Sequence, residues 1–144
     1  MSITQISVFV ESKPGHMGRV LGAFAQNAIN VHGFSASDTG EYGIVRFVVD
    51  DTRRAIAVLE GLGAAARKTE VVCVKLSDTV GQLQKVMETL AQAQLNVSYC
   101  YSLASTYIAL SVRDIAAAET ALKGAGMAVV DNSELADFMV GETM

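Results

Sequence analysis

The stretch ESKPGHMGRVLGAFAQNAINV, residues 11–31, decides how this chain of 144 residues folds. Branched apolar residues occupy every second position of residues 6–10, which indicates a half-buried strand. A turn through Pro14 and Gly15 follows. Apolar residues then recur as on one face of a helix, at Met17, Val20, Leu21, Phe24, Ala25 and Ala28. Many phosphate sites begin with a strand, a glycine turn and a helix, so the stretch raises the question of which small molecule it holds.

The same arrangement occurs twice along the chain. Residues 6–31 align with residues 72–97 at an offset of 66, and residues 51–63 align with residues 114–126 at an offset of 63. The matched positions include Val8 with Val74, Gly15 with Gly81, Val20 with Val86, Asn30 with Asn96, Val31 with Val97 and Asp51 with Asp114. Because glycines and apolar residues recur in the same order, the chain is interpreted as a tandem repeat.

Each copy predicts the element order βαββαβ. In the first copy, Asp51 or Thr52 caps the second helix and Gly63 ends it. The expected strands there are 6–11, 31–36, 44–50 and 64–67, and the first helix starts near residue 15. The second copy predicts strands 71–77, 97–103, 106–113 and 127–131 and helices 80–94 and 115–124. The last residues are expected to form a short helix or a docked tail.

The fold class is therefore α+β, with two ferredoxin-like βαββαβ units. We expect domain 1 at residues 1–68 and domain 2 at residues 69–144, each an antiparallel four-stranded sheet with both helices on one face. Each copy holds only about 60–70 residues, a marginal size for independent stability. We therefore expect the copies to pair with each other and with a second chain, as a homodimer.

Charge and composition exclude several classes of function. The net charge is −4 and the pI is about 5.1, so nucleic acid would be repelled. No apolar run approaches the ~18 residues of a membrane span, and the start of the chain has no basic region typical of a signal peptide. Cys73 and Cys100 lie in strand-like runs without a CxxC pattern, which predicts two buried thiols in a cytoplasmic protein. Two histidines without clustered carboxylates argue against a metal site, and no cofactor is expected.

The pattern as a whole resembles the ACT domain. The resemblance rests on a strand ending in ESKPG, a helix opening with Val20 and Leu21, and INV at the start of the next strand. It covers the chain as a tandem pair and implies a regulatory module that binds an amino acid at an interface between two domains. No catalytic domain accompanies the pair here, so the resemblance implies a stand-alone binding protein.

The resemblance also implies site residues. Ligand-binding members use polar groups just before the Pro-Gly turn and an asparagine at the start of the second strand. Carried over by position, these are Ser12 and Asn30 in the first copy and Asp78 and Asn96 in the second. Some serine-sensing members have a histidine where this chain has Val10, and Val80 replaces the proline of the second turn.

The chemistry of a free amino acid agrees with this arrangement. Its carboxylate can bind free N–H groups at the start of a helix, and its ammonium needs oxygen acceptors. The candidate ligand-binding residues are Ser12, Lys13, Gly15, His16, Met17, Gly18, Asn30, Val31, Asp78, Gly81 and Asn96. Each also has a purely structural explanation, since both glycines can serve the turn and both asparagines can satisfy backbone groups. A phosphate site is less favoured, because GHMG matches neither GxxxxGK[ST] nor GxGxxG.

The leading hypothesis is a non-catalytic regulatory protein that binds a free amino acid or a similar small zwitterion between ACT-like units. The alternative is an assembly subunit that docks onto an enzyme of amino-acid metabolism without binding a ligand itself. An enzymatic function is not expected, because the sequence shows no nucleophile–base pair and no second carboxylate placed with the first.

Overall fold

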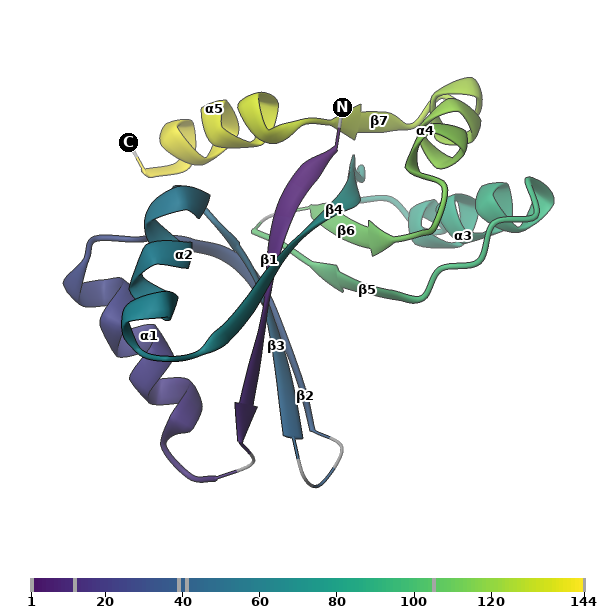
Figure 1. Ribbon diagram of the computed structural model, residues 1–144. Coiled ribbons are helices and arrows are strands. Elements are labelled where there is room, and N and C mark those ends of the chain that lie inside the picture. The colour runs from purple at the N-terminus through teal and green to yellow at the C-terminus, as the bar shows by residue number, and fades with distance from the viewer. Residues whose placement is uncertain (1, 12, 39, 41, 105, 144) are drawn as a thin grey trace. The chain divides into compact units, whose positions relative to one another are not determined.

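The computed structural model describes residues 2–11, 13–38, 40, 42–104 and 106–143, with side chains described up to residue 137. Figure 1 shows its elements along the chain. They are β1 (Ile3–Glu11), α1 (His16–Gln26), β2 (Val31–Asp38), β3 (Tyr42–Val49), α2 (Thr52–Gly61), β4 (Ala65–Lys75), α3 (Gln82–Gln92), β5 (Tyr99–Ser102), β6 (Tyr107–Ser111), α4 (Ile115–Gly124), β7 (Ala128–Val130) and α5 (Asn132–Thr143). The βαββαβ order predicted from the sequence is present twice, which confirms the α+β fold class.

The chain forms two compact units. The N-terminal unit is Thr4–Thr69, and the C-terminal unit is Met1–Ile3 together with Glu70–Met144. The sequence predicted separate strands at 64–67 and 71–77, whereas the structure has the single strand β4. Residues 68–70 contain no glycine or proline, so nothing in this segment turns the chain. The expected domain boundary between residues 68 and 69 stays a prediction.

The N-terminal unit has the strand order β2-β3-β1-β4. β1 runs antiparallel to β3, with Ile6 opposite Phe47 and Val8 opposite Val45. Helices α1 and α2 lie on the same side of β1, β2 and β3 (Figure 1). The core between them is closed by Phe24 of α1, whose ring meets Phe47 edge-on at a centroid distance of 5.3 Å. The buried core residues are Ile6, Val8, Val20, Phe24, Ile29, Val45, Phe47, Val49, Ala55 and Leu59.

The C-terminal unit repeats this arrangement with the strand order β7-β4-β6-β5, and all three pairings are antiparallel. Its core lies between one face of β4 and β6 and the apolar faces of α3 and α4. The buried residues are Val72, Val74, Val86, Leu90, Ile108, Leu110, Val112, Ala118, Leu122, Met127 and Val129. Equivalent sequence positions therefore fill equivalent cores, as the offsets of 66 and 63 predicted.

The second helix of each unit begins with an aspartate cap. The side chain of Asp51 accepts a hydrogen bond from the N–H of Arg54 at 3.1 Å, and that of Asp114 accepts one from the N–H of Ala117 at 3.0 Å. Each contact satisfies an N–H that has no acceptor within the helix. Of the two cap candidates in the first copy, the structure selects Asp51.

The turn between the first strand and the first helix has the same geometry in both units. In the N-terminal unit the Lys13 N–H donates to the Glu11 carbonyl at 2.8 Å, and Gly15 has a φ of +89°. In the C-terminal unit the Thr79 N–H donates to the Ser77 carbonyl at 2.9 Å, and Gly81 has a φ of +87°. This positive φ is costly for residues with a Cβ, so the turn itself requires both glycines.

The two cysteines differ in environment. Cys73 on β4 is fully buried, and burial raises the pKa of its thiol to about 12, with a further contribution from the charge of Glu134. Cys100 is exposed, so the expectation of two buried thiols is wrong for this residue. It lies on the four-residue strand β5 at the edge of its sheet, where only one neighbouring strand covers it.

Replacing either cap should weaken its own unit. We expect Asp51→Ala and Asp114→Ala each to lower the free energy of unfolding by about 1 kcal/mol, because one N–H of the following helix loses its acceptor. Urea denaturation of the three proteins measures this. A conservative Asp51→Ser change should retain most of the stability, and an equal loss in that variant would contradict a capping role.

Two glycines near the start of α1 should respond to substitution in opposite directions. We expect Gly15→Ala to destabilise the protein by about 1 kcal/mol, because its backbone is left-handed. Gly18→Ala should stabilise it by about 0.5–1 kcal/mol, since Gly18 lies exposed inside α1 and a Cβ there meets no atom within 4 Å. Thermal unfolding compares them, and loss of stability in both variants would contradict this assignment.

The thiols should react at different rates. In the native protein we expect one rapidly labelled thiol per chain with an aromatic disulfide reagent near pH 8, and two after denaturation. The Cys73 thiol is both buried and protonated at that pH, whereas Cys100 is accessible. Cys100→Ser should abolish the rapid phase, and rapid labelling of that variant would refute the burial of Cys73.

Candidate functional site

A cavity of about 390 Å³ lies beside the first turn of the N-terminal unit. Its position follows from strand pairing, because β1 and β3 are antiparallel with Val10 opposite Gly43. This register brings the β2–β3 hairpin next to the end of β1, where the chain turns into α1. The lining residues are Val10, Glu11, Lys13, Pro14, His16, Met17, Ala36, Ser37, Asp38, Gly43 and Val45.

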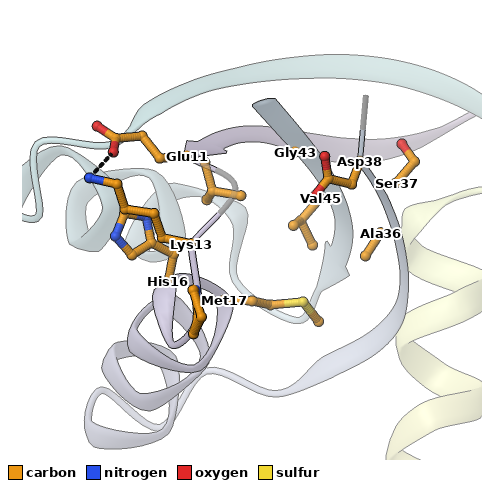
Figure 2. Close-up of a pocket in the computed structure, with 11 residues that line it drawn as sticks. Glu11, Lys13, His16, Met17, Ala36, Ser37, Asp38, Gly43 and Val45 are labelled. Carbon is orange, nitrogen blue, oxygen red and sulfur yellow. Dashed lines mark ion pairs between the residues drawn. The ribbon is translucent and has the colours of Figure 1, made fainter. Parts of the chain in front are cut away.

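Charged groups of both signs border this cavity. Figure 2 shows Glu11, Lys13 and His16 on one side and Asp38 on the opposite side. The Lys13 ammonium contacts the Glu11 carboxylate at 2.9 Å, and this hydrogen bond lowers the pKa of Glu11 and raises that of Lys13. The Asp38 carboxylate accepts a hydrogen bond from the Gly40 N–H at 2.6 Å. The site thus offers the ion pair of Lys13 and Glu11 on one side and the Asp38 carboxylate on the other.

The start of α1 forms a further part of the wall. Pro14, His16 and Met17 line the cavity, and α1 begins at His16 with Gly15 as its N-cap. Among the described residues, no side chain caps this end of the helix. The His16 N–H donates to the Lys13 carbonyl at 3.3 Å, whereas the N–H groups of Met17 and Gly18 have no acceptor within the helix. These groups carry a partial positive charge, so this end can accept an anion.

The C-terminal unit has a cavity of about 500 Å³ at the equivalent place. The turn is as tight as the first, although Val80 with a fully exposed side chain replaces the proline. Its lining residues are Leu76, Ser77, Asp78, Thr79, Gly81, Gln82, Leu83, Gln84, Ser102, Thr106, Tyr107 and Ile108.

The two cavities differ in charge. Ser77, Thr79 and Gln82 stand where the first unit has Glu11, Lys13 and His16. The hydroxyls of Ser77 and Thr79 hydrogen-bond to each other at 2.8 Å, in place of the ion pair. Asp78 is the one charged residue in the lining described for this cavity. The repeat therefore preserves the shape of the turn and changes its chemistry.

The structure gathers only part of the candidate set around the first turn. Lys13, His16 and Met17 line the cavity of the N-terminal unit, and Asp78 and Gly81 line that of the C-terminal unit. Gly15 and Gly18 belong to the start of α1 without lining the cavity, and Ser12 lies outside the described residues. The binding roles of all these residues stay predictions.

The asparagines of the candidate set lie elsewhere. Asn30 follows α1, an 11-residue helix about 16 Å long that separates it from the turn. Its backbone N–H donates to the Asp50 carboxylate at 3.0 Å. Val31 begins β2 beside it, and His32 next to that is half-buried, which lowers its pKa against the opposing effect of Asp50. Asn96 occupies the equivalent place in the C-terminal unit and lines another cavity there.

Sequence reasoning missed Glu11, Ser37 and Asp38 as parts of this cavity. The strands were expected at residues 31–36 and 44–50, whereas β2 extends to Asp38 and β3 begins at Tyr42. Nothing in the repeat drew attention to Asp38. A signal was available in the topology. Since β1 and β3 had to pair in antiparallel fashion, the hairpin before β3 had to lie beside the end of β1.

Among the described residues, no helix combines the length and the hydrophobicity that crossing a membrane requires. No cluster of three or more histidine, cysteine, aspartate or glutamate side chains suited to a metal ion occurs in that part of the chain.

Several solved structures resemble this chain. Protein BT0572 from Bacteroides thetaiotaomicron matches with 25% identity and a TM-score of 0.88, over 94% of this chain and 96% of that one. The regulatory subunit of aspartate kinase from Thermus thermophilus, in its ligand-free form, matches with 22% identity and a TM-score of 0.62, over 83% and 87% of the two chains. The regulatory subunit of aspartate kinase from Thermus flavus matches with 20% identity and a TM-score of 0.60, over 85% of this chain and 91% of that one. No protein of curated function matches the chain at a significant level.

The family comparison agrees with the repeat, the topology and the turns described above. The model of the ACT domain pair matches residues 1–137, which is nearly the whole chain. The resemblance noted from the Pro-Gly turn and the INV strand is thereby confirmed, and this chain belongs to the ACT domain pair family.

Proposed function

We propose that this chain is a non-catalytic regulatory protein that binds a free amino acid in the cavity beside the β1–α1 turn. The observation that carries the proposal is the placement of Lys13 and Asp38 on opposite sides of one cavity of about 390 Å³. A zwitterion has separate positive and negative groups, and this cavity presents a partner for each.

The carboxylate of the ligand would bind at the start of α1. The first-turn N–H groups and the Lys13 ammonium are both donors, and the helix dipole favours a negative charge there. Lys13 already contacts Glu11, but both side chains are more than half exposed. An exposed ion pair of this kind is weak, so Lys13 can exchange its partner at little cost.

The ammonium would bind on the hairpin side. The two oxygens of the Asp38 carboxylate offer about four acceptor positions, one of which the Gly40 N–H uses. The Ser37 hydroxyl lies beside it in the lining. The ligand side chain would then meet Val10, Met17, Ala36 and Val45.

Other ligand and reaction classes fit this cavity less well. Glu11 and Asp38 would repel a phosphate dianion, so the phosphate reading of the first turn is not favoured. Ser37 and His16 both line the cavity, and among the described residues no hydrogen bond joins them as in a nucleophile–base pair. The name of the Thermus thermophilus relative, a regulatory subunit, also supports regulation over catalysis.

We further propose a cytoplasmic homodimer. Large apolar side chains of the N-terminal unit are exposed, with Phe9 at 44%, Phe34 at 55% and Tyr42 at 59%. Such residues gathered on one small unit favour contact with another protein surface. Two free cysteines, one of them exposed, favour a reducing compartment. An assembly subunit docking onto an amino-acid-metabolism enzyme is the alternative, and the same experiment separates the two.

The test is a calorimetric and thermal-shift titration with each of the proteinogenic amino acids. At 100 times its Kd the bound ligand should stabilise the protein by about 2.7 kcal/mol. Asp38→Asn should weaken binding by more than about tenfold, because a hydrogen bond between charged groups is lost. Sedimentation of the same samples reports whether the ligand shifts the population of dimers.

The matched control is Asp78→Asn, which removes the same charge from the equivalent cavity of the C-terminal unit. This variant should leave unchanged the Kd of the amino acid that binds most tightly. Equal weakening by both variants would contradict the placement of the ligand at Asp38. Absence of stabilisation by every amino acid would refute ligand binding and favour the assembly subunit.

A further inference from the structure

A second cavity of the N-terminal unit, of about 370 Å³, lies where β1 and α2 end and β4 begins. It adjoins the cavity of Lys13 and Asp38, because Val10, Glu11 and His16 line both. Of the candidate residues named from the sequence, this lining contains only His16. The walls that belong to this cavity alone are Phe9, Arg19, Val20, Tyr42 and residues 62–65.

A small residue at the turn before β4 leaves room for this cavity. Ala64 occupies this position, and the offset of 63 places Met127 at the equivalent position of the C-terminal unit. The two turns share one backbone geometry, since Gly63 and Gly126 have φ values of +71° and +82°. Met127 is buried in the core of its unit, whereas Ala64 is only partly buried against the core of the N-terminal unit. A methyl group in place of the long methionine side chain leaves space at this end of the core.

Two exposed aromatic rings, those of Phe9 and Tyr42, border this space. The C-terminal unit has the charged Lys75 at the position of Phe9, so the sheet does not require an aromatic ring there. Val20 and Leu62 add aliphatic surface to the same lining. These side chains together offer apolar walls that suit a flat ring.

Arg19 gives the cavity a positive charge. It lies in α1 with an exposed side chain, and among the described residues its guanidinium forms no ion pair. Glu11 also borders the cavity, but its carboxylate contacts the Lys13 ammonium at 2.9 Å. The guanidinium is therefore the charge in this lining that lacks an opposite charge beside it, and it matches a single anionic group.

We propose that this cavity binds a small aromatic carboxylate, with its ring against Phe9, Tyr42 and Leu62 and its carboxylate on Arg19. A guanidinium donates two parallel hydrogen bonds to a carboxylate, which makes the pairing strong and directional. A dianion such as phosphate fits less well, because Glu11 repels its second charge and the apolar walls gain nothing from it.

This site does not rest on the proposed function. Neither Lys13 nor Asp38, the charged partners of the proposed amino acid, lines it. Benzoate serves as the probe because it carries a ring and a carboxylate but no ammonium for Asp38. Asp38→Asn should therefore weaken amino-acid binding and leave the Kd of benzoate unchanged, so that failure of one site is distinguishable from failure of the other.

The test follows the Gly63 and Ala65 amides by ¹⁵N–¹H NMR while the full chain is titrated with benzoate at constant ionic strength. We expect saturable shifts of both amides, which belong to the lining. Acetate lacks the ring and benzyl alcohol lacks the charge, so the Kd of each should be at least about tenfold higher than that of benzoate.

Two pairs of variants separate the contributions of charge and ring. Arg19→Gln should weaken benzoate binding about tenfold, because charge-assisted hydrogen bonds are lost. Arg53→Gln, which removes the same charge from an exposed position of α2 outside the lining, should bind as the wild type does. Phe9→Ala should also weaken binding, whereas Phe34→Ala, at an exposed position of β2 outside the lining, should not.

A further variant tests the origin of the space. Ala64→Met introduces the residue that the C-terminal unit has at this position, so it should fill the cavity and abolish the benzoate shifts. Thermal unfolding shows whether this variant folds. Arg19→Gln and Phe9→Ala change exposed side chains and test the site whatever that result.

Three results would overturn the proposal. An equal Kd of benzoate in the wild type and in Arg19→Gln would remove Arg19 from the site. Acetate binding as tightly as benzoate would exclude recognition of the ring. Equal weakening by Phe9→Ala and Phe34→Ala would place the benzoate outside this cavity.

Discussion

The antiparallel pairing of β1 with β3 is the constraint on which the candidate site depends. Val10 stands opposite Gly43, and a Cβ at Gly43 would come within 3.1 Å of the Val10 side chain. Gly43 therefore permits this pairing, because a residue with a Cβ would crowd Val10 at the end of β1. The hairpin that carries Asp38 and the turn that carries Lys13 are far apart in sequence, and the pairing brings them to one cavity. Neither group would face a common ligand in a sheet of another register.

Comparing the two copies separates the residues that the fold requires from those that it leaves free to change. The aspartate caps, the left-handed glycines and the core positions are the same in both units. Charged positions are not, since the pair of Glu11 and Lys13 becomes Ser77 and Thr79. Backbone geometry and core packing account for the residues that the two units share. The residues that differ are those that the scaffold does not determine.

Much of the fold could be predicted from the sequence, because it is set by local patterns that the repeat displays twice. Alternating apolar residues defined strands, and Asp51 and Gly63 marked the ends of a helix. The continuity of β4 was missed, since the expected break at residues 68–70 had no turn residue to cause it. Exposure of Cys100 was missed because a strand-like run does not reveal whether the strand lies at an edge.

The site was less predictable than the fold. Lys13, His16 and Met17 are neighbours in sequence, and the turn identified them together. Asp38 required knowledge of which strands pair, and the side chains of a hairpin give no signal of the neighbour they will meet. Asn30 shows the reverse difficulty. The family pattern grouped it with the turn as a ligand-binding residue, and the length of α1 keeps the two apart within one unit.

Joining both copies in one polypeptide has a consequence for how this protein can evolve. A dimer of identical single domains carries identical sites, so any substitution alters both at once. In this chain Glu11 and Lys13 are encoded separately from Ser77 and Thr79, so the cavities at the two first turns can change independently. A tandem pair therefore carries two different cavities in a fixed ratio of one to one.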